Sequence, residues 1–271
     1  MRAYRSKKTK TNSAKNDSWQ GYRGSCKGSL KIVGIGPGQA GQMSRHAREA
    51  IKRCRVLIGY KTYLKLLGNL VNGKEIISSG MTEEIDRVKR AIELAGNGEK
   101  VCLISSGDPG VYGMAGLVLE LLDKKDLDKI EIEIIPGIIS ANACASLLGA
   151  PLMHDFAVVS LSDLLTDLEL IKRRIKLAAK ADFVIVLYNP KSAKRIIPFK
   201  AAIDILLKHK PDNTPVGIVR NAYRDDQEVI ITTLKRLISS DKIDMVTTIV
   251  IGNSKTYLKG PYMITPRGYD L

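Results

Sequence analysis

The stretch LKIVGIGPGQAG, residues 30–41, joins a short apolar run to a glycine-rich turn. An apolar run of strand length that ends in such a turn is typical of the first strand and helix of a parallel α/β unit. Gly36, Gly38 and Gly41 also match the G-x-G-x-x-G spacing of the dinucleotide-binding turn. The stretch therefore indicates the fold class and raises the question of which ligand the turn holds.

The surroundings of this turn argue against a nicotinamide dinucleotide. Pro37 removes one of the backbone N–H donors that would face a pyrophosphate. The acidic residue expected about 20 residues later, which would bind the ribose, is replaced by Gly-Tyr-Lys at residues 59–61. Two alternatives remain open. In one, Lys61 binds the extra phosphate of a phosphorylated dinucleotide; in the other, the turn is tight and holds no ligand.

Apolar runs of strand length alternate with amphipathic stretches of helix length as far as residue 137. We expect strands at residues 30–35, 55–60, 74–78, 101–105 and 131–137, and helices at 44–54, 82–96 and 112–124. In the second of these helices, the side chains expected to face inward are Ile85, Val88, Ile92 and Ala95. Strands separated by helices predict parallel βα units.

The pattern changes after Gly149-Ala150-Pro151, which we interpret as a domain boundary. Further strands are expected at FAVVSL, DFVIVLY, PVGIVR, EVIITTL and VTTIVIG, with helices at residues 166–181 and 196–208. Only YRDDQ separates PVGIVR from EVIITTL, which predicts an antiparallel hairpin. The predicted fold is therefore two α/β domains, residues 29–150 with a mainly parallel sheet and residues 151–271 with a mixed sheet.

The net charge of +15 is unevenly distributed. Residues 1–28 hold eight Lys and Arg against one Asp and show no apolar periodicity, so we expect a disordered basic extension. The other residues still carry an excess of eight basic side chains, which suits an acidic ligand. No apolar run approaches the roughly 20 residues that span a bilayer, and no signal peptide is recognisable, so we expect a cytoplasmic protein.

The cysteines and histidines do not cluster. No two cysteines form a C-x-x-C pair, and the histidines are scattered, so we expect buried or incidental thiols and no metal site. The residues concerned are Cys26, Cys54, Cys102, Cys144, His46, His154 and His209.

The most specific loop is SSGDPGVYGMAG, residues 105–116, which directly follows a buried strand. Its glycines let backbone approach a ligand closely, and Asp108 offers one fixed carboxylate. In open α/β sheets, ligands bind outside the carboxyl ends of the strands, where this loop lies. The alternative is that Asp108 only caps the helix that follows.

Three motifs together resemble the tetrapyrrole methylase family, whose members use S-adenosylmethionine. They are GIGPG at residues 34–38, GDP at 107–109 and PGI at 136–138. The resemblance extends from about residue 29 to the C-terminus. GYKTYL, LLGAPLMHDFAVVSLSDLLT, VLYNPKS and VGIVRNA narrow it to the branch that methylates carbon 17 of a corrin precursor and contracts its ring on the route to cobalamin.

The resemblance implies two α/β domains with the cofactor between them, a homodimer and a tetrapyrrole polycarboxylate as substrate. It implies S-adenosylmethionine as cofactor and S-adenosylhomocysteine as product. Carried over residue by residue, the implied cofactor contacts are Pro37, Ser106, Gly107, Asp108, Val111, Ile139, Ser140, Asn189 and Ala222. Any cobalt would arrive inside the substrate.

The resemblance does not settle the catalytic base. Uroporphyrinogen-methylating relatives have a proton-accepting Asp directly after the second strand, where this chain has Tyr60. Tyr60, His154 and Asp155 are therefore the acid–base candidates, and Lys61 and Tyr63 the candidates for binding substrate carboxylates.

Two alternative functions remain open at this level. One is a methylase of the same fold that acts on another corrin carbon or on diphthamide. The other is a nucleic-acid-binding protein that uses the basic extension, although this extension lacks a recognised binding motif.

Overall fold

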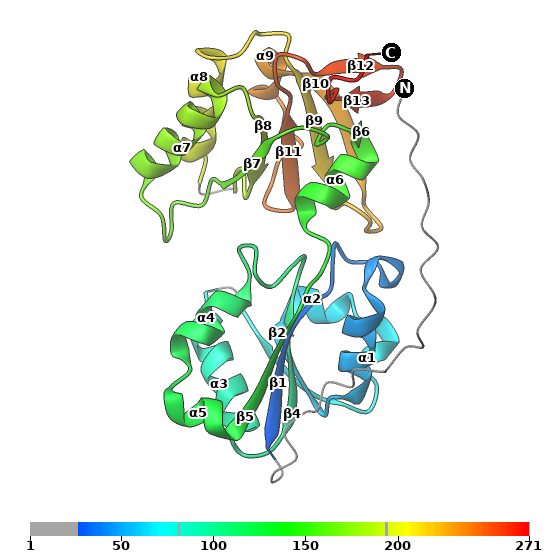
Figure 1. The fold of residues 1–271 in the computed structure, drawn as a ribbon, viewed down its shortest axis with the longest axis vertical. Coiled ribbons are helices and arrows are strands. Elements are labelled where there is room, and N and C mark those ends of the chain that lie inside the picture. Colours follow the sequence, from blue (N-terminus) through cyan, green and yellow to red (C-terminus); the bar gives the residue numbers. More distant parts are fainter. Residues whose placement is uncertain (1–26, 81, 193–194, 271) are drawn as a thin grey trace, which may run out of the picture.

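The computed structural model describes residues 27–80, 82–192 and 195–270. Figure 1 shows two α/β halves, which we call the first half (residues 27–135) and the second half (residues 140–270), joined by residues 136–139. Most of the predicted basic extension lies outside the described residues, as does Cys26. Among the described residues, every helix is too short or too polar to cross a membrane.

The first half contains a five-stranded sheet with the order β3-β2-β4-β1-β5, in which every neighbouring pair is parallel. Its strands are β1 (Gly28–Gly34), β2 (Val56–Tyr60), β3 (Glu75–Ser79), β4 (Lys100–Ser105) and β5 (Ile130–Ile135). Its helical elements are η1 (Ala40–Gln42), α1 (Arg45–Arg53), α2 (Lys61–Lys65), η2 (Gly68–Val71), α3 (Glu84–Gly96), α4 (Met114–Leu121) and α5 (Lys124–Lys129).

Helices cover both faces of this sheet because its strands are apolar on both sides. In β1, Leu30 and Ile32 join a core cluster with α3 and α4, whereas Val33 joins a second cluster with α1 and α2. The prediction that Ile85 faces inward is wrong, since 53% of this residue is exposed. The buried stripe of α3 runs through Val88 and Ala95, and Ile85 lies to one side of it in the first turn.

The second half contains a mixed sheet with the order β10-β9-β11-β8-β7, as the sequence predicts. The pair β7–β8 is parallel and the other pairs are antiparallel, including the predicted β9–β10 hairpin. The strands are β7 (Phe156–Ser160), β8 (Val184–Tyr188), β9 (Pro215–Arg220), β10 (Glu228–Thr233) and β11 (Thr247–Ile251). A three-stranded sheet is formed by β12 (Tyr257–Lys259), β13 (Tyr262–Ile264) and β6 (Gly149–Ala150).

The helices of the second half also occupy both faces of its sheet. Side chains of α7 (Leu168–Lys180), α8 (Ile197–Leu207) and α9 (Leu234–Leu237) pack against one face, and α6 (Ser140–Leu148) packs against the other. The predicted boundary after residue 150 stays a prediction. Because α6 packs against Val184 and Val186 of β8, the boundary between the halves is better placed at residues 136–139.

The described cysteines confirm the prediction of buried thiols. Cys54, Cys102 and Cys144 are free and buried. Burial raises the pKa of the Cys144 thiol, which keeps it protonated at neutral pH.

Candidate functional site

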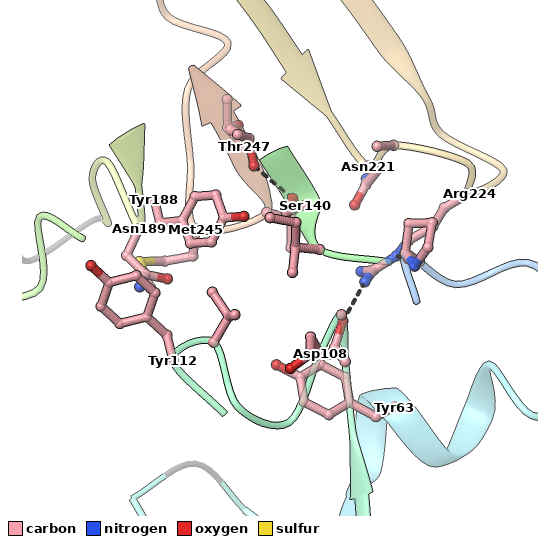
Figure 2. Close-up of a pocket in the computed structure, with 18 residues that line it drawn as sticks. Tyr63, Asp108, Tyr112, Ser140, Tyr188, Asn189, Asn221, Arg224, Met245 and Thr247 are labelled. Atoms are coloured by element: carbon pink, nitrogen blue, oxygen red, sulfur yellow. Dashed lines mark hydrogen bonds between the residues drawn. The ribbon is translucent and has the colours of Figure 1, made fainter. Parts of the chain in front are cut away.

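A pocket lies between the two halves, where the carboxyl ends of the first half's parallel strands face the second half (Figures 1 and 2). Loops after β1, β4 and β5 supply one side, and loops after β8, β9 and the approach to β11 supply the other. The pocket encloses about 200 Å³. Its lining residues are Pro37, Tyr63, Ser106, Gly107, Asp108, Val111, Tyr112, Ile139, Ser140, Tyr188, Asn189, Asn221, Ala222, Arg224, Met245, Val246, Thr247 and Thr248.

Three glycines bring the loops after β1, β4 and β5 into backbone contact beneath this pocket. A Cβ on Gly137 would lie 2.1 Å from the carbonyl oxygen of Gly107, and a Cβ on Gly34 would lie 2.7 Å from the same oxygen. The loops also exchange two backbone hydrogen bonds, from Gly36 N to Gly107 O at 3.1 Å and from Gly107 N to Gly36 O at 2.9 Å. We call Gly34, Gly107 and Gly137 the glycine crossing.

Two of the three fingerprint glycines are required by the backbone conformation of the first turn. Gly36 has a φ of 68° and Gly38 a φ of 147°, both in the range that favours glycine. A Cβ on Gly41 would meet no atom within 4 Å, and this glycine needs no special φ. Only part of the G-x-G-x-x-G pattern is thus structurally required, which agrees with the sequence argument against a dinucleotide.

Asp108 fixes the junction between two of these loops. One carboxylate oxygen accepts a hydrogen bond from Gly110 N at 2.7 Å, and the other accepts one from Gly137 N at 3.0 Å. The side chain does not cap α4, whose N-cap residue is Gly113. The capping alternative is therefore wrong, and Asp108 instead ties the loop after β4 to the loop after β5.

The backbone on the second half's side of the pocket adopts conformations that side chains rarely permit. Asn189 and Asn221 have positive φ angles of 51° and 49°, and Tyr112, from the first half, has a φ of 52°. Such residues cost of order 1–3 kcal/mol each and cluster at binding sites and active sites. All three line the pocket, which supports its assignment as the functional site.

Two side chains join the halves on opposite sides of the pocket. Tyr112 contacts β7, where its hydroxyl donates to Val158 O and accepts from Ser160 N, both at 3.3 Å. Arg224 reaches in the other direction, and its Nε donates to Pro37 O at 2.7 Å. Figure 2 shows these residues at opposite ends of the pocket.

The nine residues that the family resemblance implies as cofactor contacts all line this one pocket. Tyr63, predicted to bind substrate, lines it too, and its ring packs edge-on against Tyr60 with centroids 5.2 Å apart. Burial raises the pKa of Tyr63, and the positive charge of Arg224 opposes this rise. Tyr60, an acid–base candidate, is the last residue of β2 and does not itself line the pocket.

The other candidates lie apart from the lining. Lys61 is exposed at the start of α2 and does not line the pocket. His154 and Asp155 are exposed and contact each other, with His154 Nδ1 accepting from Asp155 N at 2.8 Å. Neither lines the pocket, so their proposed acid–base role gains no support from their position.

Several lining residues are not among those that the sequence singles out. Arg224 lies in the RNAYRD loop, which the sequence marks only as a loop at a strand end. Tyr112 lies inside the GDPGVYG loop, and Tyr188 precedes Asn189. Each of these residues belongs to a motif that can be recognised in the sequence, but the sequence does not indicate that Arg224 contacts the first half.

Tyr188 attaches the end of β8 to the start of α6. Its hydroxyl accepts a hydrogen bond from Ala141 N, in the first turn of α6, at 2.7 Å. Ser140, the first residue of α6, is linked to Thr248 by a hydroxyl–hydroxyl hydrogen bond of 2.8 Å. These bonds satisfy groups at a helix start that would otherwise lack partners.

We expect Tyr188→Phe to lower the free energy of unfolding by about 1–3 kcal/mol, because Ala141 N would lose its acceptor. Burial raises the pKa of Tyr188 to about 12. This lies above the value of about 10 in an unfolded chain, so the contribution is complete below about pH 10 and is lost as pH rises through about 12. Denaturant unfolding should show the difference between wild type and variant shrinking by about 1 kcal/mol between about pH 9 and about pH 11. A constant difference would contradict this assignment.

Comparisons with known proteins agree on one family. The profile described as "Tetrapyrrole (Corrin/Porphyrin) Methylases" matches residues 29–238. The "Cobalt-factor III methyltransferase" of Priestia megaterium is 52% identical over 90% of this chain. The chain spans only 46% of that protein's length. The "Probable cobalt-factor III C(17)-methyltransferase" of Salmonella typhimurium is 48% identical over 89% of this chain and is covered completely.

Solved structures give the same result for the fold. The structure titled "Crystal structure of the methyltransferase CobJ" matches 88% of this chain and 100% of its own, with 31% identity and a TM-score of 0.81. A uroporphyrin-III C-methyltransferase from Thermus thermophilus, solved with S-adenosylhomocysteine, matches 83% of this chain and 97% of its own. Its identity is 20% and its TM-score 0.62, so that likeness concerns the fold alone.

Proposed function

The chain belongs to the tetrapyrrole (corrin/porphyrin) methylases, and from that membership we propose that it methylates carbon 17 of a corrin precursor during cobalamin biosynthesis. The methyl donor in this proposal is S-adenosylmethionine, and the macrocycle is cobalt-factor III or precorrin-3B. Methylation is accompanied by contraction of the ring. The names of the two relatives, together with the motifs that define the branch, support this substrate.

One observation carries the proposal, namely that nine residues from loops far apart in the sequence meet in a single pocket. The pocket chemistry suits the donor. Gly107 leaves its backbone accessible, since a Cβ there would meet nothing closer than 3.8 Å. Val111 and Ile139 offer apolar surface for an adenine, while Asp108 and Asn189 offer polar anchors for hydroxyl and ammonium groups.

Methyl transfer depends on the positioning of the two reactants more than on acid–base catalysis. When bound, the donor supplies an electrophilic methyl group on a sulfonium, whose departure as a neutral thioether is favourable. Transfer forms a bond from C17 to the methyl carbon while the carbon–sulfur bond breaks, with its electron pair going to sulfur. The protein's task is then to hold the macrocycle carbon within about 3–3.5 Å of the methyl carbon.

A tetrapyrrole is much larger than the donor, so we place the donor inside the pocket and the macrocycle at its open side. Tyr60 ends β2, and Lys61 and Tyr63 lie in α2, from which Tyr63 lines the pocket. Ring contraction requires a base that removes a proton from a ring hydroxyl. In our proposal, Tyr60 is preferred to His154 and Asp155 for this role, because its ring packs against Tyr63, which lines the pocket.

Labelled product analysis tests the proposal directly. The protein is incubated with a methyl donor labelled at the methyl carbon and with either cobalt-factor III or precorrin-3B. We expect one labelled methyl at C17 of a ring-contracted product, located by mass spectrometry and carbon NMR. Label at another ring carbon would refute the C17 assignment, and transfer to neither macrocycle would refute the substrate class.

We also propose that the protein is a homodimer and that it is located in the cytoplasm. The family resemblance supports the homodimer. Light scattering after size-exclusion chromatography would test the oligomeric state, and a mass of one chain would refute it.

A further inference from the structure

Arg224 enters the pocket from the second half and ends among loops of the first half (Figure 2). Its Nε donates to Pro37 O at 2.7 Å, and its Nη2 approaches Ser106 Oγ at 3.4 Å. A Cβ on Gly38 would lie 2.9 Å from this Nε and 3.0 Å from Cγ of the same arginine. The glycine at position 38 therefore leaves the space through which the side chain passes.

The positive charge of Arg224 has no acidic partner among the described residues. None of the ion pairs found there includes it. Asp108 is the one acid among the described residues that lines the pocket, and both of its oxygens accept from backbone N–H groups of Gly110 and Gly137. Burial lowers the pKa of Arg224, which reflects a charge that has lost water without gaining a carboxylate.

The guanidinium also retains donors that face the pocket. An arginine carries five N–H groups in a planar fork, and the two contacts to Pro37 and Ser106 use only two of them. A planar fork with free N–H groups matches the two oxygens of a carboxylate. A half-buried charge without a partner is costly, and a ligand carboxylate would remove that cost.

We propose that Arg224 is the carboxylate receptor of this pocket and that it orients a ligand between the two halves. The inference rests on the proposed function, because both ligands of that reaction carry carboxylates. The donor has one, on its amino-acid portion, and the macrocycle has several on its side arms. The two contacts with the first half hold the guanidinium in place before the ligand arrives, which reduces the entropy lost on binding.

The test separates the two sources of the carboxylate. S-adenosylhomocysteine and 5′-methylthioadenosine share the nucleoside and the thioether, but only the first has a carboxylate. Their affinities for wild type, Arg224→Gln and Arg224→Lys are measured by calorimetry. Binding of the macrocycle is measured separately by the change in its visible absorption. Arg173→Gln, on the exposed face of α7, is the matched control for loss of one positive charge.

Either of two results supports the proposal. If the donor carboxylate is bound, Arg224→Gln weakens S-adenosylhomocysteine about 10- to 100-fold and leaves methylthioadenosine unchanged. If a macrocycle carboxylate is bound, the same factor is lost from macrocycle affinity while both nucleosides bind as before. In both cases, Arg224→Lys recovers part of the loss, because it keeps the charge but not the planar fork.

Two other results overturn it. Equal weakening of all three ligands together with a lower melting temperature would make Arg224 a structural link between the halves and no more. Affinities within about twofold of wild type and of Arg173→Gln would remove it from the site. Failure of wild type to methylate either macrocycle would refute the proposed function separately. The comparison of S-adenosylhomocysteine with methylthioadenosine would still show whether Arg224 binds the donor carboxylate.

Discussion

Gly137→Ala is expected to lower the melting temperature by about 10 °C and to abolish detectable binding of S-adenosylhomocysteine. The new Cβ would lie 2.1 Å from Gly107 O and 2.9 Å from Gly34 O, and all of these are backbone atoms that cannot rotate away. Overpacking of this kind costs about 3 kcal/mol or more. In a protein of this size, each kcal/mol shifts the melting temperature by about 2–4 °C. Differential scanning calorimetry and ligand titration would measure the two effects.

Gly41→Ala is the matched control for this substitution. Gly41 lies in the fingerprint turn after β1, where a Cβ would meet nothing within 4 Å, and its φ is ordinary. We expect its melting temperature and its affinity to equal those of wild type. If Gly137→Ala behaved like Gly41→Ala, the glycine crossing would not be the rigid element described above.

Asp108→Ala is expected to weaken S-adenosylhomocysteine about 100-fold. The substitution removes a charged acceptor from two backbone N–H groups, each such bond being worth about 1.5–3 kcal/mol, and it releases the loop after β4 from the loop after β5. Asp108→Asn keeps the shape but only one acceptor oxygen, so its loss should be intermediate. Calorimetric titration of the three proteins would measure this order.

Asp123→Ala is the control for this substitution, because it removes a carboxylate that accepts a hydrogen bond from a backbone N–H group outside the pocket. Asp123 forms a capping box at the start of α5, away from the pocket, and its loss should cost about 1 kcal/mol of stability. Its ligand affinity should not change. An Asp108→Ala protein that lost only as much affinity as Asp123→Ala would show that the carboxylate plays no part in the binding site.

The strands could be predicted because each is a compact apolar run between turn residues. In β1 and β4 the burial of side chains on both faces also follows from the sequence, since both faces are covered. Short elements escaped prediction. The five residues of α2 are too few to show helical periodicity, and β12 and β13 have three residues each, which is below the length at which a strand pattern is recognisable.

The pocket could be predicted through family motifs, and its internal contacts could not. Arg224 and Pro37 are 187 positions apart in the chain, so no local pattern relates them. The close approach of Gly137 to Gly107 is likewise a property of three loops meeting in space. Periodicity reports only on neighbours within one element, which is why such contacts between loops required the structure.

Among the described residues, the chain passes between the halves once, through residues 136–139, and this has a consequence for synthesis on the ribosome. All five strands of the first sheet precede this passage, so that sheet can close while the second half is still being synthesised. At about 5–20 residues per second, the nascent chain spends several seconds with the first half complete. Throughout that interval Pro37 and Ser106 have no Arg224 to contact, so the links across the pocket form only near the end of translation.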